Sequence, residues 1–271
     1  MRIKLLSAAK YAFLIIMAVL VIVPLLYVVL TAFTPLEDIG KSLFFPARLS
    51  LRNFRTVLFE TQFIKYIGNT LFVAVFVVFG SMFINSMAAY GFARIRFPGR
   101  GFFFMLLVAT LIVPGEVLIV PQYMIVSRLG WIDNYASLII PGLASAFYIF
   151  FMRQFFLGLP GELEDSAAID GCSRYRTYLS IMLPLIKAPM LTVALLTFFG
   201  VWDSFLWPLT VINTPSKYMI QIAISVLNTE TFSDVGAQFG NVVLSSLPIV
   251  LLFLWLQKYY VAGITSGSVK G

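Results

Sequence analysis

The sequence contains no histidine and only one cysteine, Cys172. Their scarcity excludes, within this chain, a zinc site of the His/Cys type, a histidine-dependent catalytic triad and a framework of disulfides. Charged residues make up 11% of the chain, compared with about 25% of a soluble domain. The chain also lacks the phosphate-binding motif Gly-x-x-x-x-Gly-Lys-Ser/Thr. We therefore expect no metal site, no cofactor and no catalytic residues in this chain.

Apolar residues dominate what is present. Hydrophobic residues form 60% of the chain, the mean hydropathy is +0.95, and there are 27 phenylalanines. This composition predicts an integral membrane protein, with apolar side chains facing lipid and aromatic rings at the interfaces. A net charge of +7 is compatible with nucleic-acid binding, but the bases lie beside apolar segments rather than in one patch. We attribute them to membrane topology and expect no nucleic-acid partner.

Six segments are long and apolar enough to cross the hydrocarbon core of a bilayer, which takes about 20 residues. We predict an all-α membrane protein with six transmembrane helices, at residues 11–33, 67–93, 102–126, 136–156, 190–212 and 241–261. They form one domain, 11–262, between a short N-terminus, 1–10, and a tail, 263–271. The first segment has 23 apolar residues, which exceeds the roughly 7–15 of a cleaved signal peptide, so we interpret it as a span.

The distribution of charge predicts the orientation of the chain in the membrane. Six spans place both termini on one side, and the termini together with the loops on that side carry a net charge of +8. The opposite side carries a net charge of −1 when Glu116 and Asp203 are counted there. Positively charged loops stay in the cytoplasm. We therefore predict that both termini and the loop 159–189 are cytoplasmic.

The loop 159–189 is the one long polar interruption in the apolar second half of the chain. Its acids stand near the start of a predicted helix, Glu162–Asp170, where the helix dipole favours them. Gly171 permits a sharp turn, and a second short helix is predicted over Ser173–Leu179. Such a pair is either a compact knob that fits a groove of a partner or a surface loop that contacts nothing.

Several polar groups fall within the predicted spans. A stripe of small and polar residues recurs every four positions in the second span: Ser81, Asn85, Ala89 and Ala93. The stripe indicates close helix packing, or a pore-lining role for Asn85. Glu116 lies between two prolines; it either faces protein or water at membrane depth or lies near the outer interface. Asp203 stands among aromatic residues in the sequence FFGVWDSFLWP.

The loop resembles a known family. Its motif follows the "EAA" loop of binding-protein-dependent ABC importer permeases: Glu-Ala-Ala, three residues, Gly, nine residues, Ile-x-Leu-Pro. The residues that match it are Asp165, Ser166, Ala167, Gly171, Ile181, Leu183 and Pro184. Asp165 replaces the family's Glu and Ser166 its first Ala, and Glu164 is a second candidate for the acid.

Two other stretches resemble carbohydrate permeases in particular. Residues 202–208, WDSFLWP, are similar to the family's Trp-Asn-Asp-Phe-Leu-Trp-Pro. The tail resembles that of the smaller permease in maltose-type transporters, where it inserts between the ATPase subunits. The matching tail residues are Thr265, Gly267, Val269, Lys270 and Gly271.

The resemblance implies a type I ABC importer permease in a bacterial inner membrane, with no catalysis of its own. It implies a second permease, two ATPase subunits that bind MgATP, and an extracytoplasmic sugar-binding protein as partners. The loop would form a coupling helix that docks on an ATPase subunit, with Glu164 and Asp170 joining the motif residues. The candidate translocation path comprises Asn85, Glu116, Trp202, Asp203 and Phe205.

Alternative functions stay open on the sequence. The tryptophans of 202–208 either stack on sugar rings or belong to an interfacial belt, and Asp203 has a structural or gating role. An ABC permease for a non-sugar solute would share the loop. A secondary transporter would need intramembrane ion-coupling groups, for which only Asp203 and Glu116 qualify.

Overall fold

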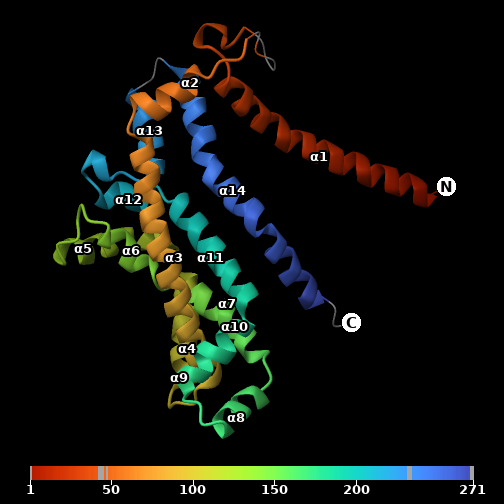
Figure 1. Cartoon of the computed structure of the whole chain (residues 1–271), viewed down its shortest axis with the longest axis vertical. Coiled ribbons are helices and arrows are strands. Elements are labelled where there is room, and N and C mark those ends of the chain that lie inside the picture. The colour runs from red at the N-terminus through yellow and green to blue at the C-terminus, as the bar shows by residue number, and fades with distance from the viewer. Residues whose placement is uncertain (1, 42–45, 47, 231–233, 269–271) are drawn as a thin grey trace. The chain divides into compact units, whose positions relative to one another are not determined.

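The computed structural model describes residues 2–41, 46, 48–230 and 234–268, and every regular element in that part of the chain is a helix. The chain divides into two compact units, Met1–Lys65 with Ile222–Pro248, and Tyr66–Gln221 with Ile249–Gly271. Two long helices, α3 (Phe63–Arg94) and α14 (Val235–Ser268), contribute residues to both units (Figure 1). The all-α fold class predicted from the composition is confirmed for the described residues.

The first unit contains α1 (Arg2–Ala32), which is strongly apolar over most of its length. Lys10–Ala32 has a mean hydropathy of 3.2 over its most apolar window, none of which is buried within the chain. The other elements of this unit are η1 (Leu36–Asp38), α2 (Arg52–Arg55), η2 (Thr56–Glu60), α13 (Ile220–Glu230) and the start of α14. An apolar helix that finds no cover within its own chain is suited to lipid or a partner subunit.

A buried amide organises the first unit. The Asn53 side chain donates hydrogen bonds to the carbonyl oxygens of Ala32 and Thr34, both at 2.9 Å. It lies against Gly236, where an added Cβ would come within 2.6 Å of the Asn53 Nδ2. The absence of a side chain at Gly236 therefore allows α14 to pack on α2 and on the end of α1.

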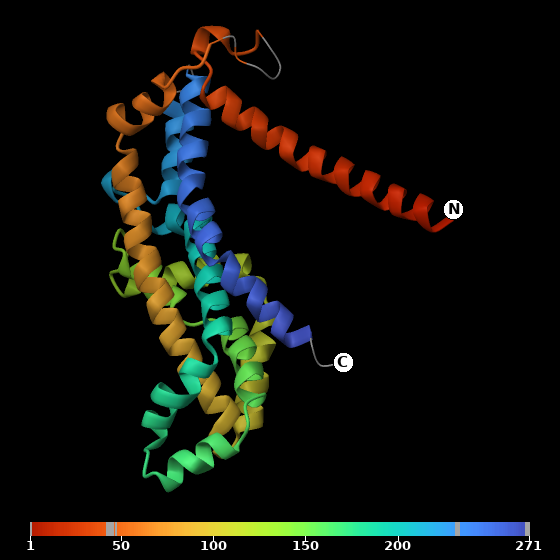
Figure 2. The same cartoon turned by 45° about the vertical axis from the view of Figure 1, so that its right-hand side comes forward.

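The second unit is built on α3. It also contains α4 (Arg100–Ala109), η3 (Thr110–Ile112), η4 (Gly115–Leu118), α5 (Ile119–Arg128), α6 (Ala136–Gly142), α7 (Ala146–Leu157), α8 (Glu162–Ile169), α9 (Arg174–Thr177), η5 (Tyr178–Met182), α10 (Leu183–Leu185), α11 (Lys187–Trp202), α12 (Leu206–Val211) and η6 (Pro215–Lys217). Figure 2 shows α8 and α9 within the green-to-teal segment that connects α7 to α11.

Two apolar clusters form the core of the second unit, and α3 contributes to both. Near its start, Val73 and Val77 pack with residues of α5, α6 and α12. Near its end, Ala89 and Ala93 pack with residues of α7, η5 and α11. A Cβ added at Gly142 of α6 would lie 3.0 Å from Val77, so the two helices approach closely through a small residue.

The structure breaks two of the predicted spans. Four helices are long and apolar enough to cross a membrane, or up to six if each bent pair counts as one span. The predicted span 102–126 is divided, because Arg100–Ile112 and Gly115–Arg128 bend by 97°. Val113 is extended before Pro114, as the steric clash with a following proline requires. The predicted span 190–212 ends as a helix at Trp202, before the separate helix α12.

Candidate functional site

The turn after α8 is a glycine-dependent helix cap. Gly171 has a φ of +74°, in the left-handed region that favours glycine. Its amide donates to the carbonyl oxygen of Ala168, and the amide of Cys172 donates to that of Ala167. These two hydrogen bonds form a Schellman motif, which ends α8 and reverses the chain. The turn predicted at Gly171 is confirmed.

The second short helix begins immediately after the turn. Ser173 is its N-cap, and the Ser173 hydroxyl oxygen accepts a hydrogen bond from the amide of Arg176 at 3.3 Å. The helix predicted over Ser173–Leu179 is divided in the structure. α9 ends at Thr177, and the π-type turn η5 continues the chain.

One acid of α8 holds this helix against the end of α3. The Tyr90 hydroxyl donates a hydrogen bond of 2.8 Å to one carboxylate oxygen of Glu164. The guanidinium of Arg94 lies 3.5 Å from the other oxygen. Arg94 also donates to the carbonyl oxygens of Phe156, at 2.7 Å, and Leu159. The end of α3 therefore binds both the end of α7 and the start of α8.

An aromatic layer lies beside this polar cluster. The Tyr90 ring centroid is 5.5 Å from that of Phe156 and 5.3 Å from that of Tyr178. The Tyr178 hydroxyl is 2.8 Å from the Ser86 hydroxyl, so even its polar atom is paired. α3, α7 and η5 are thus packed into one body under α8.

The predicted coupling residues divide into two groups. Ala167 is buried, and Ile181 and Leu183 pack against the core cluster, so these three stabilise the fold. The other members of the set are exposed or half-buried: Glu164, Asp165, Ser166, Asp170, Gly171 and Pro184.

The exposed face of the helix pair includes large apolar side chains. Ile169 is 87% exposed and Tyr175 is 59% exposed, beside the acids of α8. The sequence motifs did not mark either residue, although an isoleucine inside a polar loop is a sequence signal for an exposed apolar contact. A water-exposed Ile169 favours the interpretation of a knob with a partner over that of a loop that contacts nothing.

The predicted tail site falls largely outside the described residues. Val269, Lys270 and Gly271 are not described, and Thr265 and Gly267 belong to the part of α14 whose side chains are not described.

Asn85 has a packing role in this structure. Its side chain is fully buried and donates to the carbonyl oxygens of Ser81, at 2.7 Å, and Leu143, at 3.1 Å. Its own oxygen accepts a hydrogen bond from the amide of Ser145 at 2.8 Å. Asn85 therefore satisfies the backbone at the break between α6 and α7, and the packing interpretation of the stripe is supported over the pore-lining one.

The other predicted path residues do not gather at one site. Trp202 is 1% exposed and stacks on Phe198 at a centroid distance of 5.4 Å. Asp203 and Glu116 are exposed, and Phe205 is 39% exposed in this chain.

A cavity of about 320 Å³ lies instead around Trp207, within the second unit. Its polar and aromatic lining comprises Gln122, Tyr148, Thr197, Ser204 and Trp207. The Trp207 Nε1 donates to the carbonyl oxygen of Ser137 at 3.0 Å, which fixes the indole. The buried Thr197 hydroxyl has no hydrogen-bond partner among the described residues. The motif at 202–208 pointed to Trp207, but no sequence signal marked Gln122, Tyr148 and Thr197, which come from other helices.

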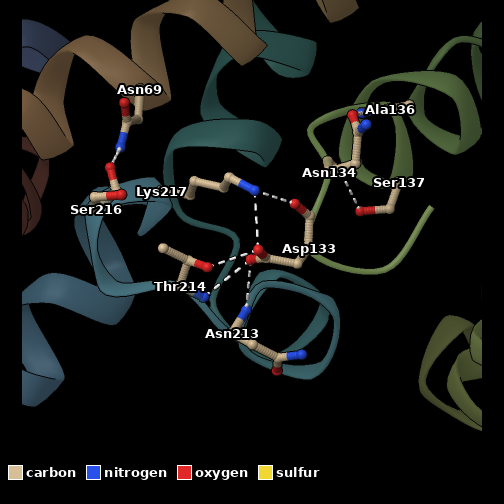
Figure 3. A network of polar contacts seen from close by, with 9 residues as sticks. All are labelled: Asn69, Asp133, Asn134, Ala136, Ser137, Asn213, Thr214, Ser216 and Lys217. Atoms are coloured by element: carbon tan, nitrogen blue, oxygen red, sulfur yellow. Dashed lines mark hydrogen bonds and ion pairs between the residues drawn. The ribbon is translucent and has the colours of Figure 1, made fainter. Parts of the chain in front are cut away.

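A second site missed by sequence reasoning joins two loops near the ends of α5 and α12 (Figure 3). The Asp133 carboxylate accepts hydrogen bonds from the amides of Asn213 and Thr214, from the Thr214 hydroxyl at 2.6 Å and from the Lys217 ammonium at 2.9 Å. The Thr214 hydroxyl, followed by Lys217, holds the pKa of Asp133 well below its usual range. The Asp133 amide also donates to Val211 at 2.7 Å, which ties the loop to the end of α12.

The fold resembles that of a solved transporter chain. It superposes with a TM-score of 0.88 and 21% identity, over 95% of this chain and 97% of the other, on a chain from the crystal structure of a bacterial ABC transporter involved in the import of the acidic polysaccharide alginate. At this identity the likeness shows the fold.

Curated relatives cover nearly the whole chain. It is 34% identical to the arabinooligosaccharides transport system permease protein AraQ of Halalkalibacterium halodurans, over 94% of this chain and 93% of the relative. It is 27% identical to the polygalacturonan/rhamnogalacturonan transport system permease protein YtcP of Bacillus subtilis, over the full length of both. It is 35% identical to the sn-glycerol-3-phosphate transport system permease protein UgpE of Brucella abortus, over 74% of this chain and 72% of the relative.

The family assignment follows from these comparisons together with a family model. The model described as binding-protein-dependent transport system inner membrane component matches residues 82–266, which include the helix pair, most of the lining of the Trp207 cavity and most of α14. The chain belongs to the family of binding-protein-dependent transport system inner membrane components.

Proposed function

We propose that the chain is a transmembrane permease subunit of an ATP-driven importer for sugars or oligosaccharides. It passes solute from an extracytoplasmic binding protein to the cytoplasm, across a bacterial inner membrane. It pairs with a second permease and with two ATPase subunits that bind MgATP. Its polypeptide crosses the membrane six times, with both termini and the helix pair α8–α9 in the cytoplasm.

The observation that carries this proposal is the exposed helix pair. The turn at Gly171 connects α8 to α9, and Glu164 binds α8 to α3. Asp165 and Ile169 remain exposed on their surface. A rigid knob with an apolar tip and acidic surroundings suits a groove in an ATPase subunit, because burying Ile169 there would be favourable. The tail from Thr265 to Gly271 would contact the same subunits.

The Trp207 cavity supports a neutral, hydroxyl-rich solute. It combines an indole with hydroxyl and amide groups, and its described lining carries no charged side chain. A relative named for arabinooligosaccharide transport agrees with a neutral carbohydrate, and one named for polygalacturonan/rhamnogalacturonan transport agrees with a carbohydrate without requiring that it be neutral. The resemblance to a glycerol-3-phosphate permease keeps a phosphorylated polyol as a second candidate, but a phosphate would find no cation in this lining.

Co-purification tests the assembly. A tagged chain extracted from its native membrane in mild detergent should carry an ATPase subunit. Asp165→Lys should lower the recovered ATPase about fivefold or more, because it reverses a charge on the docking face. Glu60→Lys makes the same charge change at an exposed acid of the first unit, outside the helix pair, and should leave recovery unchanged. Recovery of no ATPase subunit with the unmodified chain would refute the proposal.

The substrate class needs a separate measurement. The binding protein that supplies this permease should be stabilised against heat by its sugar in a panel of mono- and oligosaccharides. Stabilisation by glycerol 3-phosphate, with none by any sugar of the panel, would assign the second candidate instead.

A further inference from the structure

The two adjacent acids of α8 point to different surroundings. Glu164 is turned toward α3, and its side chain is 25% exposed. Asp165 is exposed, and its carboxylate makes no hydrogen bond or ion pair with the described residues. Neighbouring positions on a helix differ by about 100° around its axis, so both acids cannot share one face. The sequence pair Glu-Asp therefore consists of an inward and an outward carboxylate.

The inward carboxylate occupies a half-buried polar site. One oxygen accepts from Tyr90 at 2.8 Å, and the other lies 3.5 Å from Arg94, whose side chain is 14% exposed. Arg94 is held in place by the carbonyl oxygens of Phe156 and Leu159. Charge-assisted contacts in such a half-buried site are stronger than those of a surface ion pair.

We propose that Glu164 is a positioning residue that makes α8 and the end of α3 move as one body. This proposal rests on the proposed function. Asp165 then belongs to the surface that meets the ATPase subunit. Glu164 instead transmits the displacement of the helix pair into α3. Tyr90 and Arg94 are the α3 side of this connection.

The geometry explains why the connection must be polar. α8 is only two turns long and has one buried side chain, that of Ala167, so its apolar contact with the rest of the unit is small. Without the Glu164 contacts, α8 would be attached mainly by its chain connections to α7 and α9. A moving partner would then displace α8 without displacing α3.

Cys172 supplies a probe of this connection. It lines a cavity of about 210 Å³ together with Tyr90, Arg94 and Glu164, and it is half-buried. It is also the only cysteine of the chain. The rate at which N-ethylmaleimide modifies the Cys172 thiol therefore reports how often α8 separates from α3. The label is measured in the tryptic peptide that contains Cys172.

The experiment compares Glu164→Gln with Asp165→Asn in the complex purified from native membranes. Glu164→Gln should raise the Cys172 labelling rate about fivefold, because it removes the charge that Arg94 binds. It should retain the ATPase subunits while lowering ATP hydrolysis per complex. Asp165→Asn should lower ATPase recovery and leave the labelling rate unchanged.

A double-mutant cycle separates a specific contact from general loosening. Tyr90→Phe keeps the buried ring and removes only the hydroxyl that binds Glu164. Together with Glu164→Ala, which removes the acceptor of Tyr90 as well as the charge that Arg94 binds, it should raise labelling no further than the more affected single variant. Additive effects, or a labelling rate unchanged by Glu164→Gln, would overturn the proposal while leaving the ATPase partnership intact. Absence of any ATPase from the unmodified complex would instead refute the proposed function, and the transmission with it.

Discussion

The carboxylate of Asp133 lies 2.9 Å from the Nζ of Lys217, across 84 residues of sequence. Lys217 also donates to the backbone oxygen of Asp133 at 2.5 Å, so it binds the loop in two ways. Asp133 has a φ of 58°, and both its side chain and its backbone oxygen accept from the same cation. The pair joins the loop after α5 to the loop after α12.

Removal of the cation should loosen this connection. We expect Lys217→Met to lower the melting temperature of the purified chain by a few degrees, because Asp133 loses its charged partner while keeping its contacts with Thr214. Lys65→Met is the matched control, since Lys65 is exposed and no ion pair of it is recorded in the described structure. Equal effects of the two variants, measured by thermal unfolding in detergent, would contradict a role for the pair.

The pH dependence of the connection follows from the pKa of Asp133. That pKa is depressed in the folded chain, so the carboxylate contributes stability above its unfolded pKa of about 3.9. This contribution is lost only as the pH falls through that value toward the depressed one. The difference in melting temperature between the unmodified chain and Asp133→Asn should stay constant from pH 8 to about pH 5 and shrink below about pH 4. A difference that changed between pH 6 and pH 8 would assign the effect to another group.

Replacement of Gly171 should strain the helix pair without a steric clash. A Cβ added there meets nothing within 4 Å, but the φ of +74° disfavours any L side chain by about 1 kcal/mol. We expect Gly171→Ala to lower the free energy of unfolding by about that amount, and to reduce ATPase recovery. Gly161→Ala is the control, because Gly161 has equal space and a φ of −69°. A stability of Gly171→Ala equal to that of the control would contradict the Schellman cap.

Replacement of Gly236 should act through volume. A new Cβ would come within 2.6 Å of the buried amide of Asn53, which cannot move without losing its bonds to Ala32 and Thr34. We expect Gly236→Ala to destabilise the first unit by about 1–3 kcal/mol, seen as a lower yield of folded protein. Gly68→Ala also changes a helical glycine but meets only open space, so its yield should be normal.

The hydroxyl of Thr197 should matter for solute rather than for the fold. It is buried, lines the Trp207 cavity and has no partner among the described residues. Thr197→Val keeps its shape, and we expect an unchanged or slightly higher melting temperature together with weaker uptake of the transported sugar. Thr192→Val removes a hydroxyl already bonded to Ala188 on the same helix and should leave uptake unchanged. Normal uptake by Thr197→Val would remove this residue from the path.

Local signals in the sequence located the helix pair. Helix starts, caps and turns depend on contacts between a side chain and backbone groups within about four residues of it. The acids before Gly171, the glycine itself and Ser173 therefore predict the helix pair from the local sequence. The apolar composition fixed the all-α membrane class for the same reason, since a backbone in lipid must satisfy its hydrogen bonds within each helix. The apolar run around Pro114 is an exception, because its composition predicts one span and it folds as two helical segments that bend by 97° relative to each other.

Side-chain function depended on partners far along the chain. The sequence matches Asp165 to the motif and offers Glu164 as a second candidate, and the contacts of Glu164 with Tyr90 and Arg94 of α3 distinguish the two acids. The sequence permits a packing or a pore-lining role for Asn85. The hydrogen bond from its amide to the carbonyl oxygen of Leu143, at the break between α6 and α7, favours packing. The class and the helix pair were therefore determined by the sequence alone, because they arise from hydropathy and local hydrogen bonds. The tertiary structure decided which acid faces α3, and that Asp133 meets Lys217, because those contacts join elements whose approach no local pattern encodes.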